Sequence, residues 1–171
     1  MIHLYYGDGK GKTTAAAGLA LRAAGSGQQV VFAQFLKGRK SGEIESFLRI
    51  PQVTVLRGDF REKFTFEMSE TELREEAKKS SDLLEEAFLQ AAAGKADLLV
   101  LDEAVSASER KMISGERLRI LIEQNRERFE IVLTGRTPFS WMVEGADYVT
   151  KMEKIKHPYD SGVTARPGIE Y

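Results

Sequence analysis

The 171-residue sequence contains no cysteine and no long run of apolar residues. The missing cysteine excludes disulfide bonds, thiolate catalysis and cysteine-ligated metals. The missing apolar run excludes a membrane-spanning helix, so we expect no membrane partner. Because a core strand is predicted from position 2 onward, we also expect no signal peptide ahead of the fold. Together these absences favour a cytoplasmic protein.

The sequence also lacks an excess of either charge. Its 25 basic and 26 acidic residues give a formal net charge of −1. A chain with this balance has no overall attraction to nucleic acid, and we expect no such partner. With 171 residues, of which 42% are apolar, it is large enough to bury about two-thirds of its unfolded surface. We expect a single domain over residues 1–171.

A glycine-rich loop follows the first apolar segment, residues 2–6. It is formed by Gly7, Asp8, Gly9, Lys10, Gly11, Lys12, Thr13 and Thr14. A strand, a loop of alternating glycines and a helix beginning Lys-Thr indicate a phosphate-binding loop, whose backbone N–H groups converge on phosphate oxygens. Lys12 would supply a positive charge, and the Thr13 hydroxyl would bind magnesium. An ordinary glycine-rich turn is the alternative interpretation.

The first glycine of this loop is displaced. The usual spacing would put a glycine at position 6, where the sequence has Tyr6, and the glycine stands instead at Gly7. We therefore expect the triphosphate to lie differently from the way it lies in common ATPases.

Helical and strand patterns alternate along the rest of the chain. Strands are predicted at 2–6, 30–35, 53–56, 97–103, 131–133 and 148–152, and helices at 13–24, 42–50, 69–93, 115–128 and 137–144. Ser69 and Glu72 form a capping box at the start of the longest helix. This alternation predicts a doubly wound α/β fold with a mainly parallel sheet of about six strands and right-handed crossovers. Because a phosphate loop follows the first strand, we expect this sheet to form a P-loop NTPase (RecA-like) core.

Asp102 and Glu103 end the most apolar strand. A carboxylate at the carboxyl end of a central strand, beside a phosphate loop, is where such folds hold magnesium. Two solvated acids at a strand end are the alternative. The spacing leaves open which of the two would bind the metal directly.

Two further features remain ambiguous. Arg136 follows a predicted strand and could reach nucleotide phosphates or a substrate carboxylate, or could be a surface arginine on a turn. Phe64 and Phe66 would place both rings on one side of an extended segment. They would cover the sheet edge or, together with Phe60, bind a flat apolar ligand.

These features together resemble the P-loop type of ATP:corrinoid adenosyltransferases. The resemblance spans nearly the whole chain, and the matching segments are 7–16, 34–38, 64–66, 101–103, 133–136, 156–162 and 168–171. The loop alone is shared with many NTPases. Its ordered combination with the His-Pro-Tyr-Asp segment at 157–160 is specific.

The resemblance implies an unusual use of ATP. In this family a Co(I) corrinoid attacks the 5′ carbon of the ribose, the adenosyl group moves to cobalt, and triphosphate leaves intact. ATP binds reversed in the loop, which suits the displaced glycine. The implied substrates are ATP and a corrinoid, the implied metal is Mg²⁺, and a homodimer and a reduced flavin or flavodoxin-like electron donor are also implied.

The resemblance also implies roles for individual residues. Lys12 and Thr13 would stabilise the leaving triphosphate, while Phe64 and Phe66 would displace the lower axial ligand of the corrinoid. Magnesium would be bound by Thr13 and Glu103, with Asp102 as a supporting partner. The nucleotide-binding set is Gly7, Asp8, Gly9, Lys10, Gly11, Lys12, Thr13, Thr14, Gln34, Lys37 and Arg136. Residues 156–171 would close over the site.

The sequence departs from the family in three places. Phe66 stands where relatives commonly have Trp, residues 104–107 replace a leucine-rich continuation, and residues 38–64 are rearranged. The preferred corrinoid therefore stays open among cobalamin, cobinamide and cobyrinic acid diamide. Two other functions also stay open: a phosphotransferase or ATPase, which would release ADP, and a non-catalytic regulator that binds ATP or a corrinoid.

Overall fold

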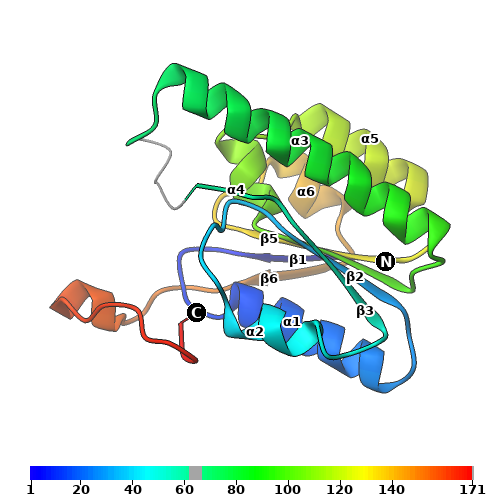
Figure 1. The fold of residues 1–171 in the computed structure, drawn as a ribbon, viewed down its shortest axis with the longest axis horizontal. Coiled ribbons are helices and arrows are strands. Elements are labelled where there is room, and N and C mark those ends of the chain that lie inside the picture. The colour runs from blue at the N-terminus through cyan, green and yellow to red at the C-terminus, as the bar shows by residue number, and fades with distance from the viewer. Residues whose placement is uncertain (62–66, 171) are drawn as a thin grey trace.

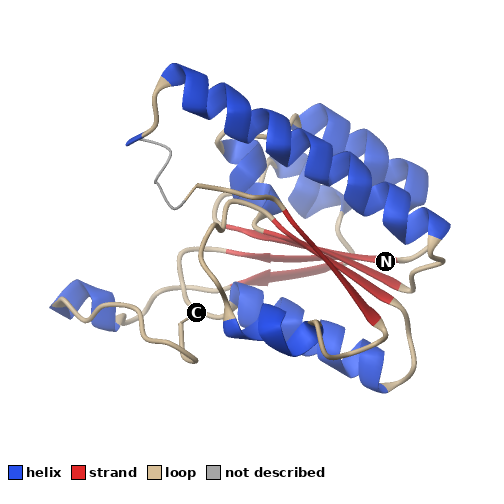
Figure 2. Cartoon of the chain, in the orientation of Figure 1, coloured by secondary structure: helices blue, strands red, loops and turns tan. Residues whose placement is uncertain are grey.

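The computed structural model describes residues 1–61 and 67–170. Six parallel strands form one twisted sheet in the order β3-β2-β4-β5-β1-β6 (Figures 1 and 2). The strands are β1 (Ile2–Tyr6), β2 (Val30–Gln34), β3 (Val53–Arg57), β4 (Leu98–Asp102), β5 (Glu130–Gly135) and β6 (Tyr148–Lys151). The sheet predicted from the sequence is confirmed.

Helices cover both faces of the sheet, as a doubly wound fold requires. One face is covered by α1 (Lys12–Gly25) and α2 (Gly42–Phe47), and the other by α3 (Glu70–Ala93), α4 (Ala104–Glu109), α5 (Gly115–Asn125) and α6 (Ser140–Gly145) (Figure 1). A short 3₁₀ helix, η2 (Pro158–Ser161), lies in the C-terminal segment, outside these layers. Within the described ranges, no helix has the length and apolar character needed to cross a membrane.

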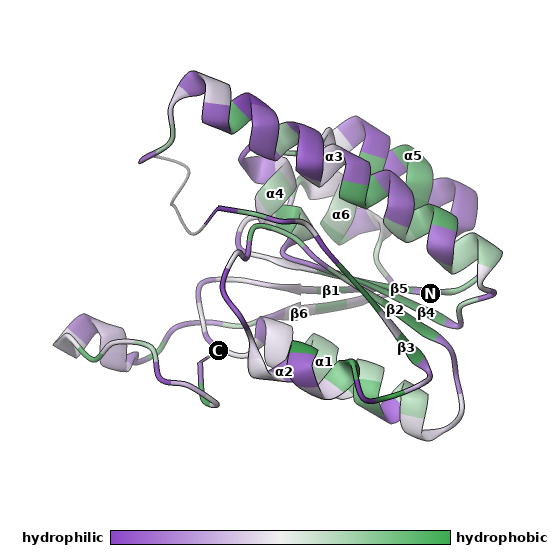
Figure 3. Ribbon diagram, in the orientation of Figure 1, coloured by the Kyte–Doolittle hydropathy of each residue, from purple (hydrophilic) through white to green (hydrophobic). Residues whose placement is uncertain are grey.

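The core has two apolar layers, one on each side of the sheet. Along β4, Leu99 and Leu101 belong to the layer under α3 and α5, whereas Leu98 and Val100 belong to the layer over α1. All five residues of β4 are buried because the strand lies in the sheet interior and is covered on both faces. In Figure 3 apolar residues follow the strands, while polar residues cover much of α3.

Local signals account for several helix boundaries. Ser69 accepts a hydrogen bond from the Glu72 amide at 3.2 Å, and the Glu72 carboxylate accepts one from the Ser69 amide at 2.9 Å, so the predicted capping box is confirmed. The helix predicted from 137 begins only at Ser140. Thr137 precedes Pro138, whose ring disfavours helical geometry at the residue before it. The other predicted boundaries lie within three residues of the observed ones.

Because all strands run in the same direction, their carboxyl ends meet at one edge of the sheet. The ends of β2, β4, β5 and β1 lie next to one another in that order. This edge brings together four segments that are far apart in the sequence, and the candidate site lies here.

Candidate functional site

The phosphate loop requires glycine at particular positions. Tyr6 is the last residue of β1, and the turn begins at Gly7, whose φ of 118° is disfavoured for any residue with a side chain. A Cβ on Gly7 would also overlap the Met152 carbonyl oxygen. A Cβ on Gly9 would lie 2.7 Å from the Glu153 carbonyl oxygen. The displaced glycine therefore stands where the chain leaves β1 and passes the backbone that follows β6.

The loop presents a group of unused backbone donors. The Gly7 amide donates to the Gly135 and Arg136 carbonyls, and the Gly9 amide donates to the Met152 carbonyl at 2.8 Å. The amides of residues 10–14 donate to no backbone or side-chain acceptor in the part of the chain that the structure describes. They surround the first turn of α1, where helix geometry leaves N–H groups without partners and the helix dipole is positive. Such a group of free amides at a helix N-terminus is able to bind an anion.

Lys12 adds a positive charge to these amides. Its Nζ donates to the Gly9 carbonyl at 2.7 Å. Burial lowers the pKa of Lys12 below its ordinary value, and repulsion from Arg136 adds to this shift, whereas the carboxylates of Glu103 and Asp8 oppose it. A bound polyanion would strengthen the charged form of Lys12, because an opposite charge nearby favours ionisation.

Asp102 is the centre of a buried hydrogen-bond network. Its Oδ1 accepts from the hydroxyls of Thr13 at 2.9 Å and Thr134 at 2.7 Å. Its Oδ2 accepts from Gln34 Nε2 at 3.1 Å and from Lys37 Nζ at 2.9 Å. These four bonds match the roughly four acceptor positions of a carboxylate, so Asp102 has no lone pair left over for a metal in this arrangement.

Glu103 is placed differently from its neighbour. Its φ of 63° lies in the left-handed region, which turns the chain directly from β4 into α4, and its amide donates to Thr134 Oγ1 at 2.8 Å. Such backbone strain in a residue other than glycine is concentrated at functional sites. Within the described ranges the Glu103 carboxylate has no hydrogen bond or ion pair, and it lines the cavity above the loop. The geometry thus distinguishes two adjacent acids whose spacing in the sequence left open which would bind a metal.

A cavity of about 540 Å³ lies over the loop. Most of the nucleotide-binding residues proposed from the sequence line it: Asp8, Gly9, Lys10, Gly11, Lys12, Thr13, Thr14, Lys37 and Arg136. The proposed metal ligand Glu103 lines it as well. Gly7, Gln34 and Asp102 do not line it. Gly7 forms the turn, and Gln34 and Asp102 lie buried behind the cavity wall.

A second cavity of about 400 Å³ opens from the first. The two share Lys37, Glu103, Arg136, Ala165 and Glu170. Apolar side chains of the second cavity are Leu36, Phe60, Met68 and Met112, and its additional cations are Arg39, Lys40, Arg61 and Arg110. Phe60 was singled out from the sequence, whereas Phe64 and Phe66 lie outside the described residues.

Sequence reasoning missed Arg110 and Met112 entirely. They follow α4, a six-residue helix with no capping signal, and only the turn at Glu103 brings them to the cavity. The buried stretch 104–107 could have pointed to α4, because four small or apolar residues directly after a central strand must also be packed.

The part of the chain that follows β6 contacts the phosphate loop at two points. Lys10 Nζ donates to the Ile169 carbonyl at 3.2 Å, and the Lys154 amide donates to Asp8 Oδ1 at 3.2 Å. Within the segment, the Arg166 side chain and backbone bind the Glu170 carboxylate, which lowers the pKa of Glu170 to about 2. Residues 157, 165 and 168–170 line the first cavity.

Comparisons with known proteins identify the family of this chain. All of residues 1–171 match the family described as ATP:corrinoid adenosyltransferase BtuR/CobO/CobP. A corrinoid adenosyltransferase of Pseudomonas aeruginosa is 34% identical over 175 residues, covering 100% of this chain and 83% of that protein. One from Escherichia coli K12 is 30% identical and covers 100% and 85% respectively.

A solved structure supports the fold alone. The KaiC-like protein of Pyrococcus horikoshii is 17% identical, with a TM-score of 0.53 over 91% of this chain and 74% of that one. Its similarity is in agreement with the RecA-like P-loop core expected from the sequence. By the match over its full length, this chain belongs to the ATP:corrinoid adenosyltransferase family.

Proposed function

We propose that this protein transfers the 5′-deoxyadenosyl group of ATP to the Co(I) centre of a corrinoid and releases triphosphate. Family membership over the whole chain supports this activity. The observation that carries it is the junction of two cavities. A phosphate loop with unused amides faces one of them, and both share Lys37, Glu103 and Arg136.

Magnesium fits the residues that surround the loop. The candidate ligands, the Thr13 hydroxyl and the Glu103 carboxylate, are the hard oxygen donors that Mg²⁺ prefers. Gln34 Oε1 is buried without a hydrogen-bond partner among the described residues, an acceptor suited to the hydrogen of a metal-bound water. Those residues contain no group of three acidic, histidine or cysteine side chains that could hold an ion alone. Triphosphate oxygens and water would complete the coordination, as Mg²⁺ sites commonly require.

The residues of the chain act on the leaving triphosphate. Cobalt supplies the electron pair of the new Co–C bond, and the pair of the broken C5′–O bond goes to the triphosphate oxygen. No proton moves, so no protein base is needed. Lys12, Arg136 and the amides of residues 10–14 point donors and charge toward the polyanion as it gains charge. Bound magnesium would neutralise part of that charge.

The corrinoid would lie in the second cavity. Phe60, Met68 and Met112 offer it an apolar surface there. Phe64 and Phe66 belong to the segment beside Phe60 in the sequence, and we assign them displacement of the lower axial ligand, which makes cob(II)alamin easier to reduce. Phe64→Ala should then slow reaction from cob(II)alamin more than reaction from chemically reduced cob(I)alamin. Equal losses of rate from cob(II)alamin and from cob(I)alamin would argue against displacement of the axial ligand by Phe64.

Further parts of the proposal concern assembly and surroundings. The contact of Lys10 with the Ile169 carbonyl supports residues 156–171 closing over the site of a single domain. We assign a cytoplasmic location, a homodimer, and a reduced flavin or flavodoxin-like donor of electrons to cobalt.

One assay tests the activity. The protein is incubated with ATP, Mg²⁺ and chemically reduced cobalamin or cobinamide, and the cobalt–carbon product is followed by absorbance. We expect product formation that depends on Mg²⁺ and on Glu103. ADP and orthophosphate without an adenosylated corrinoid would favour a phosphotransferase or ATPase, and ATP binding without turnover would favour a regulator.

A further inference from the structure

The ammonium group of Lys37 contacts one proposed magnesium ligand, Thr13, and the buried carboxylate of Asp102 beside it. Its Nζ donates to Thr13 Oγ1 at 3.0 Å and to Asp102 Oδ2 at 2.9 Å. The chain reaches this position through a left-handed turn at Leu36, with φ of 60°, two residues after the end of β2. Arg57 holds the turn by donating to the Lys37 carbonyl at 2.7 Å. The backbone around Lys37 is thus fixed, and its side chain is aimed across the end of β4.

Lys37 supplies the positive charge that Asp102 needs. The Asp102 side chain is 0% exposed, and among the described residues its ion-pair partner is Lys37. Its other partners, Thr13, Thr134 and Gln34, are neutral. A buried carboxylate with neutral donors alone would be costly, because taking a charge out of water requires an opposite charge close by.

The same ammonium competes with a metal ion for Thr13. The Thr13 hydroxyl donates its hydrogen to Asp102 and accepts from Lys37 on its oxygen. That oxygen is the one assigned to magnesium. A divalent cation and an ammonium group bound to one oxygen would repel each other strongly at this separation. Lys37 and the metal therefore cannot both hold Thr13.

The Lys37 side chain can reach a second position, in the cavity over the phosphate loop. Its side chain is 31% exposed and lines both cavities, including the one over the phosphate loop. Four rotatable carbons allow the ammonium to swing while the backbone stays fixed. A triphosphate over the loop is an anion within the cavity that Lys37 already borders.

We propose that Lys37 is an exchangeable counter-ion of the magnesium position. Its ammonium holds Thr13 and Asp102 in place before the magnesium nucleotide binds, then leaves Thr13 to the metal and moves to the triphosphate. The charge near Asp102 is conserved by the exchange. This inference rests on the assignment of magnesium to Thr13 and Glu103 in the proposed function.

The main test measures metal binding without any catalysis. Mn²⁺ binding to the nucleotide-free protein is followed by electron paramagnetic resonance for wild type, Lys37→Met and Lys40→Met. Met keeps the length of the side chain and removes the charge. Removing the competitor should tighten Mn²⁺ binding about tenfold in Lys37→Met, a coupling of ordinary size between two sites. Lys40 lines the second cavity without contacting Thr13 or Asp102, so Lys40→Met should bind as wild type does.

Thermal unfolding gives a second readout. Lys37→Met leaves the buried Asp102 carboxylate without its cation, so its melting temperature should fall below that of wild type. Added Mg²⁺ should restore much of the loss in Lys37→Met and leave wild type nearly unchanged. The double variant Lys37→Met/Glu103→Gln should not be restored. Equal Mn²⁺ affinity of wild type and Lys37→Met, with no stabilisation by Mg²⁺, would overturn the exchange.

A crystal structure of wild type with Mg²⁺ and ATP tests the exchange without any variant. Lys37 Nζ should lie beyond hydrogen-bond distance of Thr13 Oγ1 and contact the triphosphate. Lys37 still bound to Thr13 beside the metal would contradict the exchange alone. If the wild-type protein with ATP binds no Mn²⁺, the assignment of magnesium to Thr13 and Glu103 is itself wrong.

Discussion

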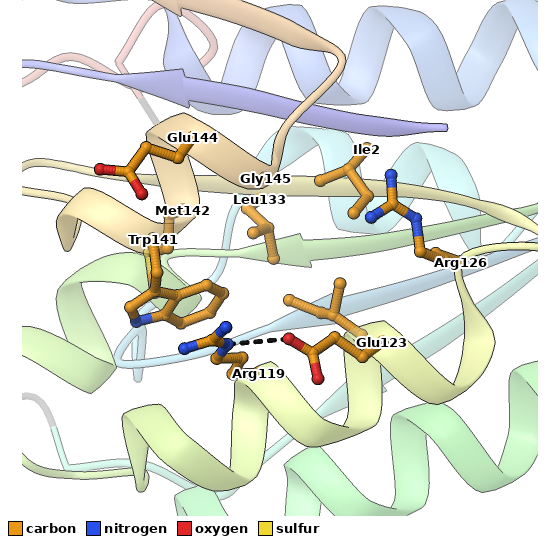
Figure 4. A pocket seen from close by; sticks show the side chains of 10 residues that line it. Ile2, Arg119, Glu123, Arg126, Leu133, Trp141, Met142, Glu144 and Gly145 are labelled. Carbon is orange, nitrogen blue, oxygen red and sulfur yellow. Dashed lines mark hydrogen bonds and ion pairs between the residues drawn. The ribbon is translucent and has the colours of Figure 1, made fainter.

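Two hollows in this molecule differ in how their polar groups are used. One lies over the phosphate loop at the carboxyl ends of the strands, and the other, of about 280 Å³, lies between α5 and α6 (Figure 4). The floor of this α5–α6 hollow includes the apolar side chains of Ile2, Leu133 and Met142. At its rim, Arg119 pairs with Glu123 at 2.8 Å and lies over the Trp141 ring.

The difference shows where folding leaves chemistry available. In the α5–α6 hollow the cations Arg119 and Arg126 already have acidic partners. Over the loop, the amides of residues 10–14, the Glu103 carboxylate and the Arg136 guanidinium have none among the described residues. Unused donors and acceptors lower stability, so their concentration at one place indicates a ligand that satisfies them.

The largest expected effect follows from removing charge over the loop. Lys12→Met should lower kcat/KM for ATP by about 10²- to 10³-fold, the usual result of removing one donor to a developing anion. Arg119→Met in the α5–α6 hollow is the matched control and should leave the rate within about twofold, because surface charges far from chemistry contribute little. Initial rates of adenosylcorrinoid formation by the two variants and wild type measure both effects. A comparable loss in Arg119→Met would break the contrast between the two hollows.

Next in size is the separation of two adjacent acids. Asp102→Asn replaces two acceptor positions by a donor, so at least one buried hydrogen bond of the network is lost and the free energy of unfolding should fall by about 1 to 3 kcal/mol. Glu103→Gln should keep stability near wild type, because its carboxylate has no structural partner among the described residues, while the activity falls and requires a higher Mg²⁺ concentration. Urea unfolding and magnesium titrations measure the two effects. Equal destabilisation by both variants would remove the distinction.

The opposite pattern is expected in the α5–α6 hollow. Met142 is 2% exposed, and Met142→Ala should lower the free energy of unfolding by about 2 to 5 kcal/mol through lost packing. At a temperature where the variant is folded, its KM for ATP should equal that of wild type. A raised KM together with intact stability would indicate that this hollow communicates with the loop.

The smallest effect is a titration at the rim of the first cavity. Hydrogen bonds from Arg166 lower the pKa of Glu170 to about 2 from an unfolded value of 4.5. Because the folded pKa is the lower one, this contact stabilises the segment above about pH 4.5 and is lost as the pH falls through about 2. Carboxyl ¹³C shifts should show a midpoint near 2 for Glu170. Arg166→Gln should move the midpoint back toward 4.5, and an unchanged midpoint would refute the pairing.

The sequence could predict the fold because its strongest signals are local. The apolar strand 98–101, the Ser69–Glu72 capping box and the glycine loop each act within a few residues. Boundaries at residues 137–140 were less accurate because they depend on Pro138 and on packing of the following helix. The short helix α4 gave no capping signal and was missed.

The site was only partly predictable, because its decisive contacts join distant segments. Thr13, Lys37, Asp102 and Thr134 come from four parts of the chain, and only the order of the parallel strands brings them together. The spacing of Asp102 and Glu103 gave no means of ranking them as metal ligands, and only the resemblance to the family favoured Glu103. In the structure their surroundings differ: the Asp102 carboxylate is hydrogen-bonded within the buried network, whereas Glu103 itself adopts a left-handed turn.

The most direct test of the account follows the oxygen that joins the ribose to the triphosphate. ATP labelled with ¹⁸O at the bridge between C5′ and the α-phosphate is incubated with the protein, Mg²⁺ and a Co(I) corrinoid, and phosphorus products are analysed by ³¹P NMR and mass spectrometry. Because the C5′–O bond is the one that breaks, we expect intact triphosphate that carries the label, in amounts equal to the adenosylated corrinoid. Formation of ADP and orthophosphate, with the ¹⁸O label still in the C5′–O–P bridge of ADP, would contradict cleavage of the C5′–O bond.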